Sequence, residues 1–315
     1  MPSSIGRFNL IDMEQKERKQ KHSLREWLLA TRPWSFPASA MPVLVTLAYL
    51  YWRGEDVNGW HGLWALLNII VFHAAGNTWS DYADYMRGVD TPASYGATTL
   101  VTKRFAPAEI RRLSLGLLLL GVLGGLLLVW RTGIPLLWIG AGGLVCTLLY
   151  PPLKYRALGD AVIAVTYGWL PVWGTSFVAT GRMDMSTLLL AVPVGMITVA
   201  ILHANNTRDI RTDARAAITT LAMKIGVRSS ARLYAFWIGF PFVFVVACVC
   251  LRLFPAWALL VFAALPPALS HIRTMDAVDA ADTASISRLD ERTAQLQLQF
   301  SLLFVLSFLL AHWVR

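Results

Sequence analysis

The first group of residues that could perform chemistry lies at the end of an apolar run, in the sequence Asn77-Thr-Trp-Ser-Asp81-Tyr-Ala-Asp84. If a helix continues through this run, Asn77, Asp81 and Asp84 stand at positions i, i+4 and i+7 and share one face. Like charges one turn apart repel each other and destabilise a helix. A positive group should therefore offset the two carboxylates, and hard oxygen ligands of this kind favour Mg²⁺.

A second group repeats the pattern, because Asn205, Asp209 and Asp213 follow one another every four residues. A single pair of acids at the end of an apolar run would most simply cap a helix or lie in a solvated loop. Two clusters with similar helical spacing favour function instead, because polar groups are costly close to hydrocarbon. Since Mg²⁺ held by carboxylates usually also binds phosphate oxygens of a substrate, the two clusters predict a diphosphate bound through bridging Mg²⁺.

A lysine at the end of another apolar run, Lys154, follows a Pro-Pro pair and a tyrosine, Tyr150. Its ammonium group could neutralise diphosphate oxygens, or it could simply reach the membrane surface as many lysines do. The tyrosine four residues earlier favours a functional role. His73 and His203 each precede one of the acid clusters by about one turn, and we interpret them as hydrogen-bonded core residues.

The elements that carry these residues are expected to be membrane-spanning helices. Of 315 residues, 56% are hydrophobic and only 15% are charged, whereas a soluble domain has about a quarter charged residues. A helix needs about 20 apolar residues to cross a bilayer. Nine stretches approach this length: 34–52, 60–79, 113–130, 134–152, 161–180, 185–206, 233–251, 253–270 and 294–314. The sequence therefore predicts an all-α, polytopic membrane bundle of about nine transmembrane helices.

The basic residues predict the orientation of this bundle. With nine spans, 23 of the 28 Lys and Arg residues fall in segments on the same side as the N-terminus. By the positive-inside rule, the N-terminus is cytoplasmic and the protein is a multi-pass protein of the cytoplasmic, or inner, membrane. The net charge of +9 fits anionic lipid or an anionic substrate, and we expect no nucleic-acid partner. Residues 1–33 are expected to form a cytoplasmic amphipathic leader, and residues 34–315 a single transmembrane domain.

The motifs resemble those of the UbiA superfamily of intramembrane aromatic prenyltransferases. Asp81 and Asp84 match the two aspartates of the family's NDxxD motif, and Asp209 and Asp213 match its DxxxD motif. The segment 150–154 matches the YxxxK element of the family. The resemblance implies that the four aspartates bind Mg²⁺ and, together with the lysine, act in catalysis. It also implies a prenyl diphosphate and an aromatic acceptor as substrates, and nine membrane-spanning helices.

Three stretches resemble the branch of this superfamily that prenylates 1,4-dihydroxy-2-naphthoate in menaquinone synthesis. They are 30–37 with 42–45, then 88–91, and 205–213 with 220–222. Together with the neighbouring motifs, they supply the side chains that we expect to bind substrate: Arg32, Asn77, Asp90, Tyr150, Asn205 and Arg208. Ser80 and the pair Ala217-Ile218 depart from the family pattern, which has Asn and Gly-Lys at these positions.

Two alternatives remain open at the level of the sequence. Within the same superfamily, the acceptor could be 4-hydroxybenzoate, although the sequence after Asp90 lacks the Arg-Thr pair expected of that branch. From another functional class, nine spans with intramembrane polar residues permit a secondary transporter of an anionic solute. Transporters place their binding sites near the bilayer midplane, whereas both acid clusters here lie at the ends of spans.

Overall fold

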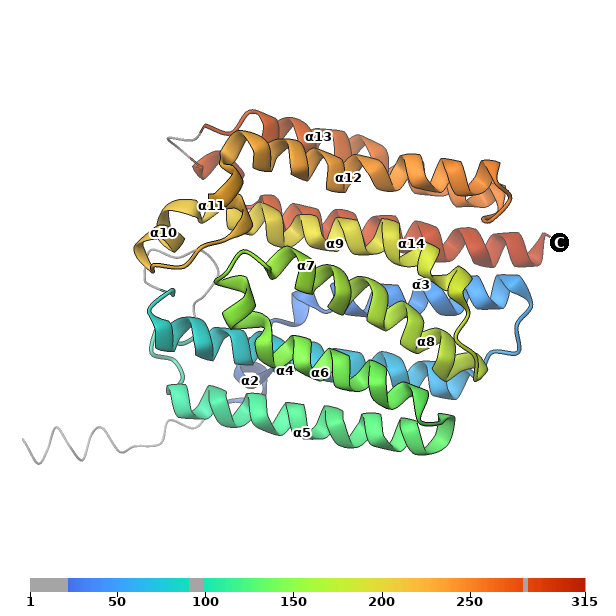
Figure 1. Cartoon of the computed structure of the whole chain (residues 1–315), viewed down its shortest axis with the longest axis horizontal. Helices are drawn as coiled ribbons and strands as arrows, with labels where there is room; N and C mark the ends of the chain where they lie inside the picture. The colour runs from blue at the N-terminus through green and yellow to red at the C-terminus, as the bar shows by residue number, and fades with distance from the viewer. Residues whose placement is uncertain (1–21, 91–98, 280–282, 315) are drawn as a thin grey trace, which may run out of the picture.

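The computed structural model describes residues 22–90, 99–279 and 283–314. Over these residues the chain forms long helices that run side by side (Figure 1). Their bounds, with the shorter helices between them, are α2 (Leu24–Ala30), η1 (Pro33–Ser35), α3 (Pro37–Arg53), α4 (Gly59–Arg87), α5 (Pro107–Thr132), α6 (Pro135–Lys154), α7 (Gly159–Ala164), η2 (Val165–Trp169), α8 (Leu170–Thr180), η3 (Met185–Thr187), α9 (Leu188–Arg208), α10 (Ile210–Arg215), α11 (Leu221–Ile225), α12 (Val227–Cys250), η4 (Ala256–Ala264), α13 (Leu265–Asp276), η5 (Ala284–Ile286) and α14 (Leu289–Trp313).

Seven helical segments of the described chain are long and apolar enough to cross a membrane. They are α5, α6, α7 to α8, η3 to α9, α12, η4 to α13 and η5 to α14. The remaining two of the nine predicted spans are α3, which is shorter at 17 residues, and α4, which is less apolar but has 29 residues. Both lie alongside the other helices in Figure 1. The prediction of an all-α polytopic membrane bundle is confirmed.

Local sequence signals explain where the helices that carry the site begin and end. The side chain of Asn58 caps the start of α4 by accepting a hydrogen bond from the His61 amide at 3.0 Å. The end of α4 is set by Gly88, whose φ of 73° lies in the left-handed region that glycine adopts without a steric cost. Prolines stand at the first position of α5 and α6, where a missing amide hydrogen is harmless.

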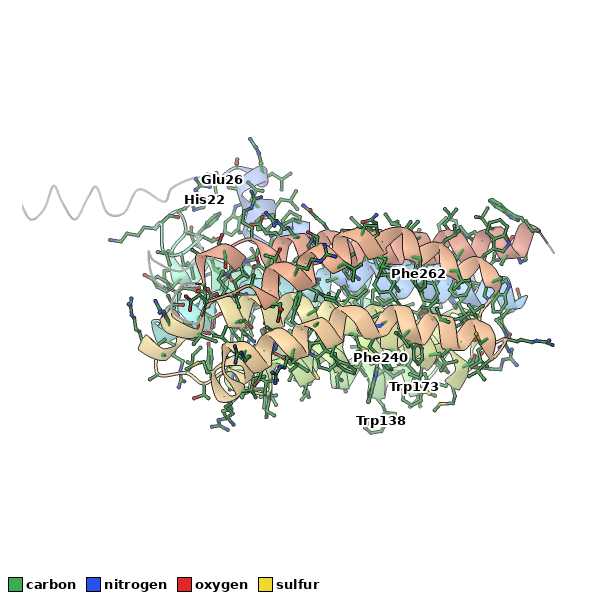
Figure 2. All side chains as sticks on the ribbon, turned by 90° about the horizontal axis from the view of Figure 1, so that it is seen from above. His22, Glu26, Trp138, Trp173, Phe240 and Phe262 are labelled. Atoms are coloured by element: carbon green, nitrogen blue, oxygen red, sulfur yellow. The ribbon has the colours of Figure 1, made fainter. Side chains whose placement is uncertain are left out.

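The largest hydrophobic core lies among α3, α8, α9, α12, α13 and α14. Three phenylalanines of α14, namely Phe300, Phe304 and Phe308, are fully buried at one-turn spacing. Their rings meet Phe254 and one another edge-on or tilted. In contrast, many leucines of α5 are exposed, and Trp138 of α6 projects away from the bundle (Figure 2). These outward apolar faces are suited to contact with lipid.

Of the predicted leader, residues 1–21 lie outside the described residues. The described remainder contains α2, which begins at a capping box formed by Ser23 and Glu26. The loops that follow α4, α6 and α9 all lie at the same end of the bundle, on the left of Figure 1. The two acid clusters are therefore carried to a common end by separate helices.

Candidate active site at one end of the bundle

Helix α4 carries the first acid motif into the interior of the bundle. As predicted, the helix continues unbroken through the motif to Arg87. Asp81 and Asp84 are only 5% and 6% exposed. After Gly88 the chain folds back, so that the amides of Val89 and Asp90 approach the Asp84 carbonyl at 2.9 and 3.5 Å. This turn brings Asp90 back beside the motif.

Each buried carboxylate of the first motif has its own cation from a different element. Arg32, between α2 and η1, forms a salt bridge with Asp81. Lys154, the last residue of α6, lies 3.1 Å from the Oδ2 atom of Asp84. The hydroxyl of Tyr155 donates to the Oδ1 atom of Asp84 at 2.7 Å. The structure therefore brings together four of the predicted site residues and adds Tyr155 to them.

The backbone at Arg32 adopts an unusual conformation that directs this residue to the site. Its φ and ψ of 56° and 59° lie in the left-handed region, which costs a residue other than glycine on the order of 1–3 kcal/mol. The side-chain Nδ2 atom of Asn77 donates to the Thr31 carbonyl and to the Ser35 hydroxyl, both at 2.9 Å. Asn77 thus binds the chain on both sides of Arg32. Contact between Asn77 and substrate stays a prediction.

The second acid motif crosses a break between two helices, which the regular spacing of its residues did not predict. Helix α9 ends at Arg208, and Asp209 has φ and ψ of −92° and 8° before α10 begins. The Asp213 amide still donates to the Asp209 carbonyl at 2.9 Å, so the spacing of one turn between the two aspartates survives. The Asp213 side chain is buried, with 7% exposure of the residue.

The physical reason for the break lies in the contacts of Arg208. Its guanidinium group donates twice to the Asp209 carboxylate, at 2.8 Å each, and once to Asp290 of α14 at 2.7 Å. It also donates to the Asn205 side-chain oxygen at 2.5 Å. A bidentate arginine–carboxylate pair has a demanding geometry, and here it ties Asp209 to Arg208 and α14. Arg208 and Asn205 are engaged with the protein, and their predicted contact with substrate stays a prediction.

The described parts of the loops after α4, α6 and α10 meet at this end of the bundle. The Thr219 amide donates to the Tyr155 carbonyl at 3.0 Å, within an isolated parallel bridge between Arg156 and Thr219. Ile218 and Val89 pack with Tyr155 in a small hydrophobic cluster. Ile218 is one of the two departures from the family pattern, and it forms part of this apolar contact.

The carboxylates of the site outweigh the nearby cations. Burial, together with the neighbouring carboxylates of Asp84 and Asp81, raises the pKa of Asp90 to about 7. Burial also raises the pKa of Asp213 to about 7, although Lys154 opposes this shift. Among the described residues, Asp213 has no salt-bridge partner. The site is therefore suited to receive additional positive charge.

These observations test whether the residues fit Mg²⁺. In the described part of the chain, no three acidic, histidine or cysteine side chains are close enough to form a ligand cage. Mg²⁺, however, is usually held by one or two carboxylates together with water and substrate phosphate oxygens. Buried aspartates without enough compensating charge fit this mode of binding. Asp81, Asp84, Asp209 and Asp213 stay the predicted ligands of the ion.

Two features of the site have no counterpart among the sequence-based predictions. Tyr155 directly follows Lys154, and this position in the sequence could have marked it as a site residue. Asp160 of α7 accepts a hydrogen bond from Asn206 at 3.4 Å and contacts the Nδ1 atom of His203 at 2.7 Å. As an isolated acid in an apolar run, Asp160 could have been singled out from the sequence. These contacts confirm His203 as a hydrogen-bonded core residue, and the remaining predicted residue, Tyr150, lies one turn before Lys154 on α6.

Comparisons with known proteins show similarity to one family over most of the chain. Residues 39–290 match the UbiA prenyltransferase family. The UbiA prenyltransferase domain-containing protein 1 of Xenopus tropicalis is 32% identical, over 94% of this chain and 85% of that protein. Its counterpart in Homo sapiens is 31% identical, over 95% of this chain and 89% of that protein.

Solved structures share the fold at lower identity. A UbiA homolog from Archaeoglobus fulgidus, bound to GPP and Mg²⁺, has a TM-score of 0.62 and 13% identity, and the match covers 89% of this chain and 99% of that one. The apo structure of a UbiA homolog from Aeropyrum pernix K1 has a TM-score of 0.65 and 14% identity, covering 88% and 96%.

Proposed function

Because the chain belongs to the UbiA prenyltransferase family and is a membrane prenyltransferase, we propose that it transfers a polyprenyl group from an allylic diphosphate to an aromatic acceptor. The observation that carries this proposal is the convergence of Asp81, Asp84 and Asp213 with Lys154 at one end of an apolar bundle. Mg²⁺ bound together with the diphosphate would supply the positive charge that these carboxylates lack. This reading replaces the secondary transporter considered from the sequence.

The residues of the chain would act mainly by charge and by exclusion of water. The bond between C1 of the prenyl group and the diphosphate oxygen breaks, and both electrons leave with the diphosphate. Mg²⁺ bound with the diphosphate would neutralise this developing charge. Lys154 and Arg32 stand next to the carboxylates and can donate to departing phosphate oxygens. The loops that meet at Tyr155 and Thr219 lie at the same end of the bundle, where they would help to keep water from the allylic cation.

For the acceptor, we propose 1,4-dihydroxy-2-naphthoate, as in menaquinone synthesis. The support for this acceptor is the sequence around Arg32, Asp90 and Asn205. The names of the similar animal proteins specify no acceptor. The electron-rich ring would attack the allylic cation at the carbon that bears the carboxylate, and CO₂ would then leave.

A direct competition tests the acceptor. Purified protein receives Mg²⁺, geranyl diphosphate and equal concentrations of 1,4-dihydroxy-2-naphthoate and 4-hydroxybenzoate, and mass spectrometry identifies the prenylated product. We expect the naphthoate to be preferred. A preference for 4-hydroxybenzoate would reject the naphthoate branch and leave prenyl transfer standing.

We also propose that the protein lies in the inner (cytoplasmic) membrane and that the acid-motif end of its bundle faces the cytoplasm. The support is the distribution of Lys and Arg over the sequence. On α12, Ser229 lies near the acid-motif end and the exposed Cys250 lies at the opposite end. Two variants are compared, each with a single cysteine: one retains Cys250 and the other carries Ser229→Cys. A membrane-impermeant maleimide added to intact cells should not label the Ser229→Cys variant. Labelling of that variant in intact cells would reverse the orientation.

A further inference from the structure

Helix α14 turns a face with two glutamines towards the outside of the bundle. Gln295, Gln299, Leu302 and Leu306 are exposed and follow one another at intervals of four, three and four residues. Residues at this spacing share one face of a helix. The four side chains therefore form a stripe along α14, which we call the glutamine face, whereas the opposite side of the helix is buried in the core.

The glutamine face lies in the part of α14 that would cross the membrane. The segment from η5 to α14 is one of the helical segments long and apolar enough to do so. Arg292 is exposed and is the last Asp, Glu, Lys or Arg before Arg315. Gln299 is seven residues further along the helix, which is about 10 Å at 1.5 Å per residue. Because the hydrocarbon core is about 30 Å thick, the Gln299 side chain lies inside it and not at the level of the charged residues.

The two glutamines are unusual among the lipid-facing residues of this chain. From Leu115 to Trp130, the exposed residues of α5 are leucines, one glycine and a tryptophan. No hydrogen bond joins the side chain of Gln295 or Gln299 to another residue of the described chain. An amide group that faces hydrocarbon without a hydrogen-bond partner is costly. The glutamine face is therefore expected to contact a molecule that can form hydrogen bonds within the membrane.

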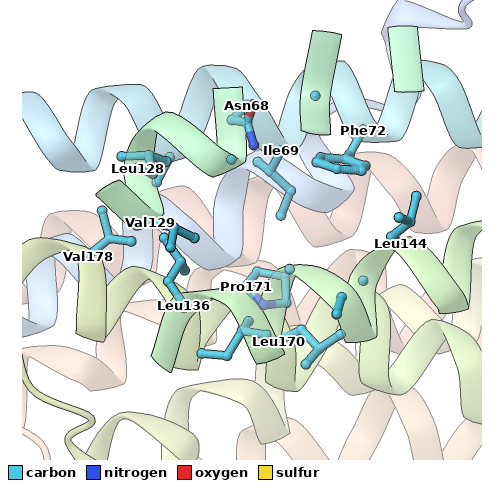
Figure 3. Close-up of a pocket in the computed structure, with 18 of the residues that line it drawn as sticks. Asn68, Ile69, Phe72, Leu128, Val129, Leu136, Leu144, Leu170, Pro171 and Val178 are labelled. Atoms are coloured by element: carbon cyan, nitrogen blue, oxygen red, sulfur yellow. The ribbon is translucent and has the colours of Figure 1, made fainter. Parts of the chain in front are cut away.

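A hollow along the glutamine face is lined by α14 alone. Its volume is about 380 Å³, and it is lined by Gln295, Leu298, Gln299, Leu302, Leu303 and Leu306. The hollow among α4, α5, α6 and α8 is different, because several helices of the same chain surround it (Figure 3). A single copy of the chain thus provides one wall of the hollow beside α14, and another molecule can provide the opposite wall.

We propose that the glutamine face packs against the same face of a second copy of this chain. Two copies have the same orientation in one membrane, so their α14 helices run parallel and identical residues meet at equal depth. A glutamine amide both donates and accepts hydrogen bonds, so Gln299 is complementary to the Gln299 of the other copy. The result is a dimer with a two-fold axis along the membrane normal. Leu302 and Leu306 continue the contact, at the spacing of a left-handed helix pair.

A membrane lipid fits this face less well than a second copy. An acyl chain has no group that could form a hydrogen bond with Gln299. The polar headgroups lie near the level of Arg292, about 10 Å away along the helix. Glutamine side chains are known to hold membrane helices together through hydrogen bonds between helices, and a second α14 supplies such a side chain at the required depth.

The first test counts the copies of the protein in phosphatidylcholine vesicles. Cys146 and Cys248 are replaced by alanine, and a fluorophore is attached to the exposed Cys250 on α12. Single-molecule photobleaching at low protein density then gives the dissociation constant of the dimer in the membrane. We expect the double variant Gln295→Leu/Gln299→Leu to raise this constant about tenfold or more, because the hydrogen bonds between the helices are lost. Its turnover should stay within about twofold of the wild-type value, which shows that the variant is folded.

The second test is disulfide cross-linking in the membrane, in a chain without its native cysteines. Leu302→Cys lies on the glutamine face, and Leu123→Cys on α5 is the matched control, because the two leucines are 51% and 52% exposed. Under mild oxidation, the Leu302→Cys protein should form a covalent dimer. The Leu123→Cys protein should remain largely monomeric at the same protein-to-lipid ratio.

Three results would overturn the inference. Equal cross-linking of the two cysteine variants would place the contact on another surface, and so would a double glutamine variant that dimerises as tightly as the wild-type protein. A wild-type protein that stays monomeric in vesicles would leave a lipid acyl chain as the occupant of the hollow beside α14. None of these measurements depends on prenyl transfer, so they leave the proposed function untouched.

Discussion

The Nζ atom of Lys154 lies 3.1 Å from Asp84, so the last residue of α6 is joined directly to the first acid motif on α4. This pair is largely buried, with side chains that are 15% and 8% exposed. Burial gives the contact two roles. It stabilises the end of the bundle, and it holds an ammonium group where a diphosphate would lose its prenyl group.

Replacement of Lys154 by methionine should therefore reduce both activity and stability. Lys154→Met keeps the length of the side chain but leaves the Asp84 carboxylate without its cation, which costs about 3–5 kcal/mol in a buried pair. We expect kcat/KM for the prenyl diphosphate to fall by roughly a hundredfold or more. Steady-state kinetics and thermal unfolding in the same detergent measure the two effects. The exposed lysine at the same end, Lys224, provides the control, and an equal loss in Lys224→Met would contradict the role of Lys154.

Asp213 should behave differently, because it is buried without a salt-bridge partner among the described residues. Asp213→Asn removes a carboxylate that destabilises the protein without ligand, so the unfolding temperature should stay the same or rise. Turnover should nevertheless fall by about two orders of magnitude or more, because the diphosphate site loses a ligand for Mg²⁺. The comparison is Asp209→Asn, which breaks the ion pair with Arg208 and should lower stability as well. Near-normal turnover of Asp213→Asn would remove this residue from the site.

The pH dependence of ligand binding follows from Asp90 and Asp213, each with a pKa raised to about 7. A carboxyl group whose pKa is raised by folding favours the folded state below its unfolded pKa, near 4, and this contribution is lost as the pH rises through 7. Positive charge bound beside the ionised carboxylates restores the lost stability. The increase in unfolding temperature caused by Mg²⁺ with geranyl diphosphate should therefore be larger at pH 8 than at pH 6. Asp90→Asn should reduce this difference, and an equal increase at both pH values would be evidence against the assignment.

Ala217 offers a test of local strain. Its φ of 54° lies in the left-handed region, which costs a residue other than glycine about 1–2 kcal/mol. Ala217→Gly should raise the free energy of unfolding by about 0.5–1 kcal/mol, after the greater flexibility of glycine in the unfolded chain is included. Ala216→Gly is the control, because φ at Ala216 is −82° and glycine brings no relief there. If both variants lose stability equally, the backbone at Ala217 is not strained.

The sequence predicted those parts of the site that depend on local periodicity. The helix that continues through Asp81 and Asp84 followed from the apolar run and the spacing of the polar residues. The salt bridge between Arg32 and Asp81 could not be predicted, because it depends on a left-handed residue between two short helices. The periodicity of a sequence reports local structure and does not indicate long-range contacts of this kind.

The break at Asp209 escaped prediction for a related reason. The period of four residues favours a continuous helix, and only the contact of Arg208 with Asp290 of α14 shows why the chain turns there. Residues 209 and 290 are far apart in the sequence.

The most direct test of the central claim is a single reaction with purified protein in detergent, without a membrane gradient. The mixture contains Mg²⁺, geranyl diphosphate and 1,4-dihydroxy-2-naphthoate, and mass spectrometry detects the product while released diphosphate is quantified. We expect a geranylated, decarboxylated naphthoquinol formed in equal amount to the diphosphate, abolished by EDTA, restored by Mg²⁺ and lost in Asp81→Asn. Product formation that persists in Asp81→Asn, or that is insensitive to EDTA, would contradict the account.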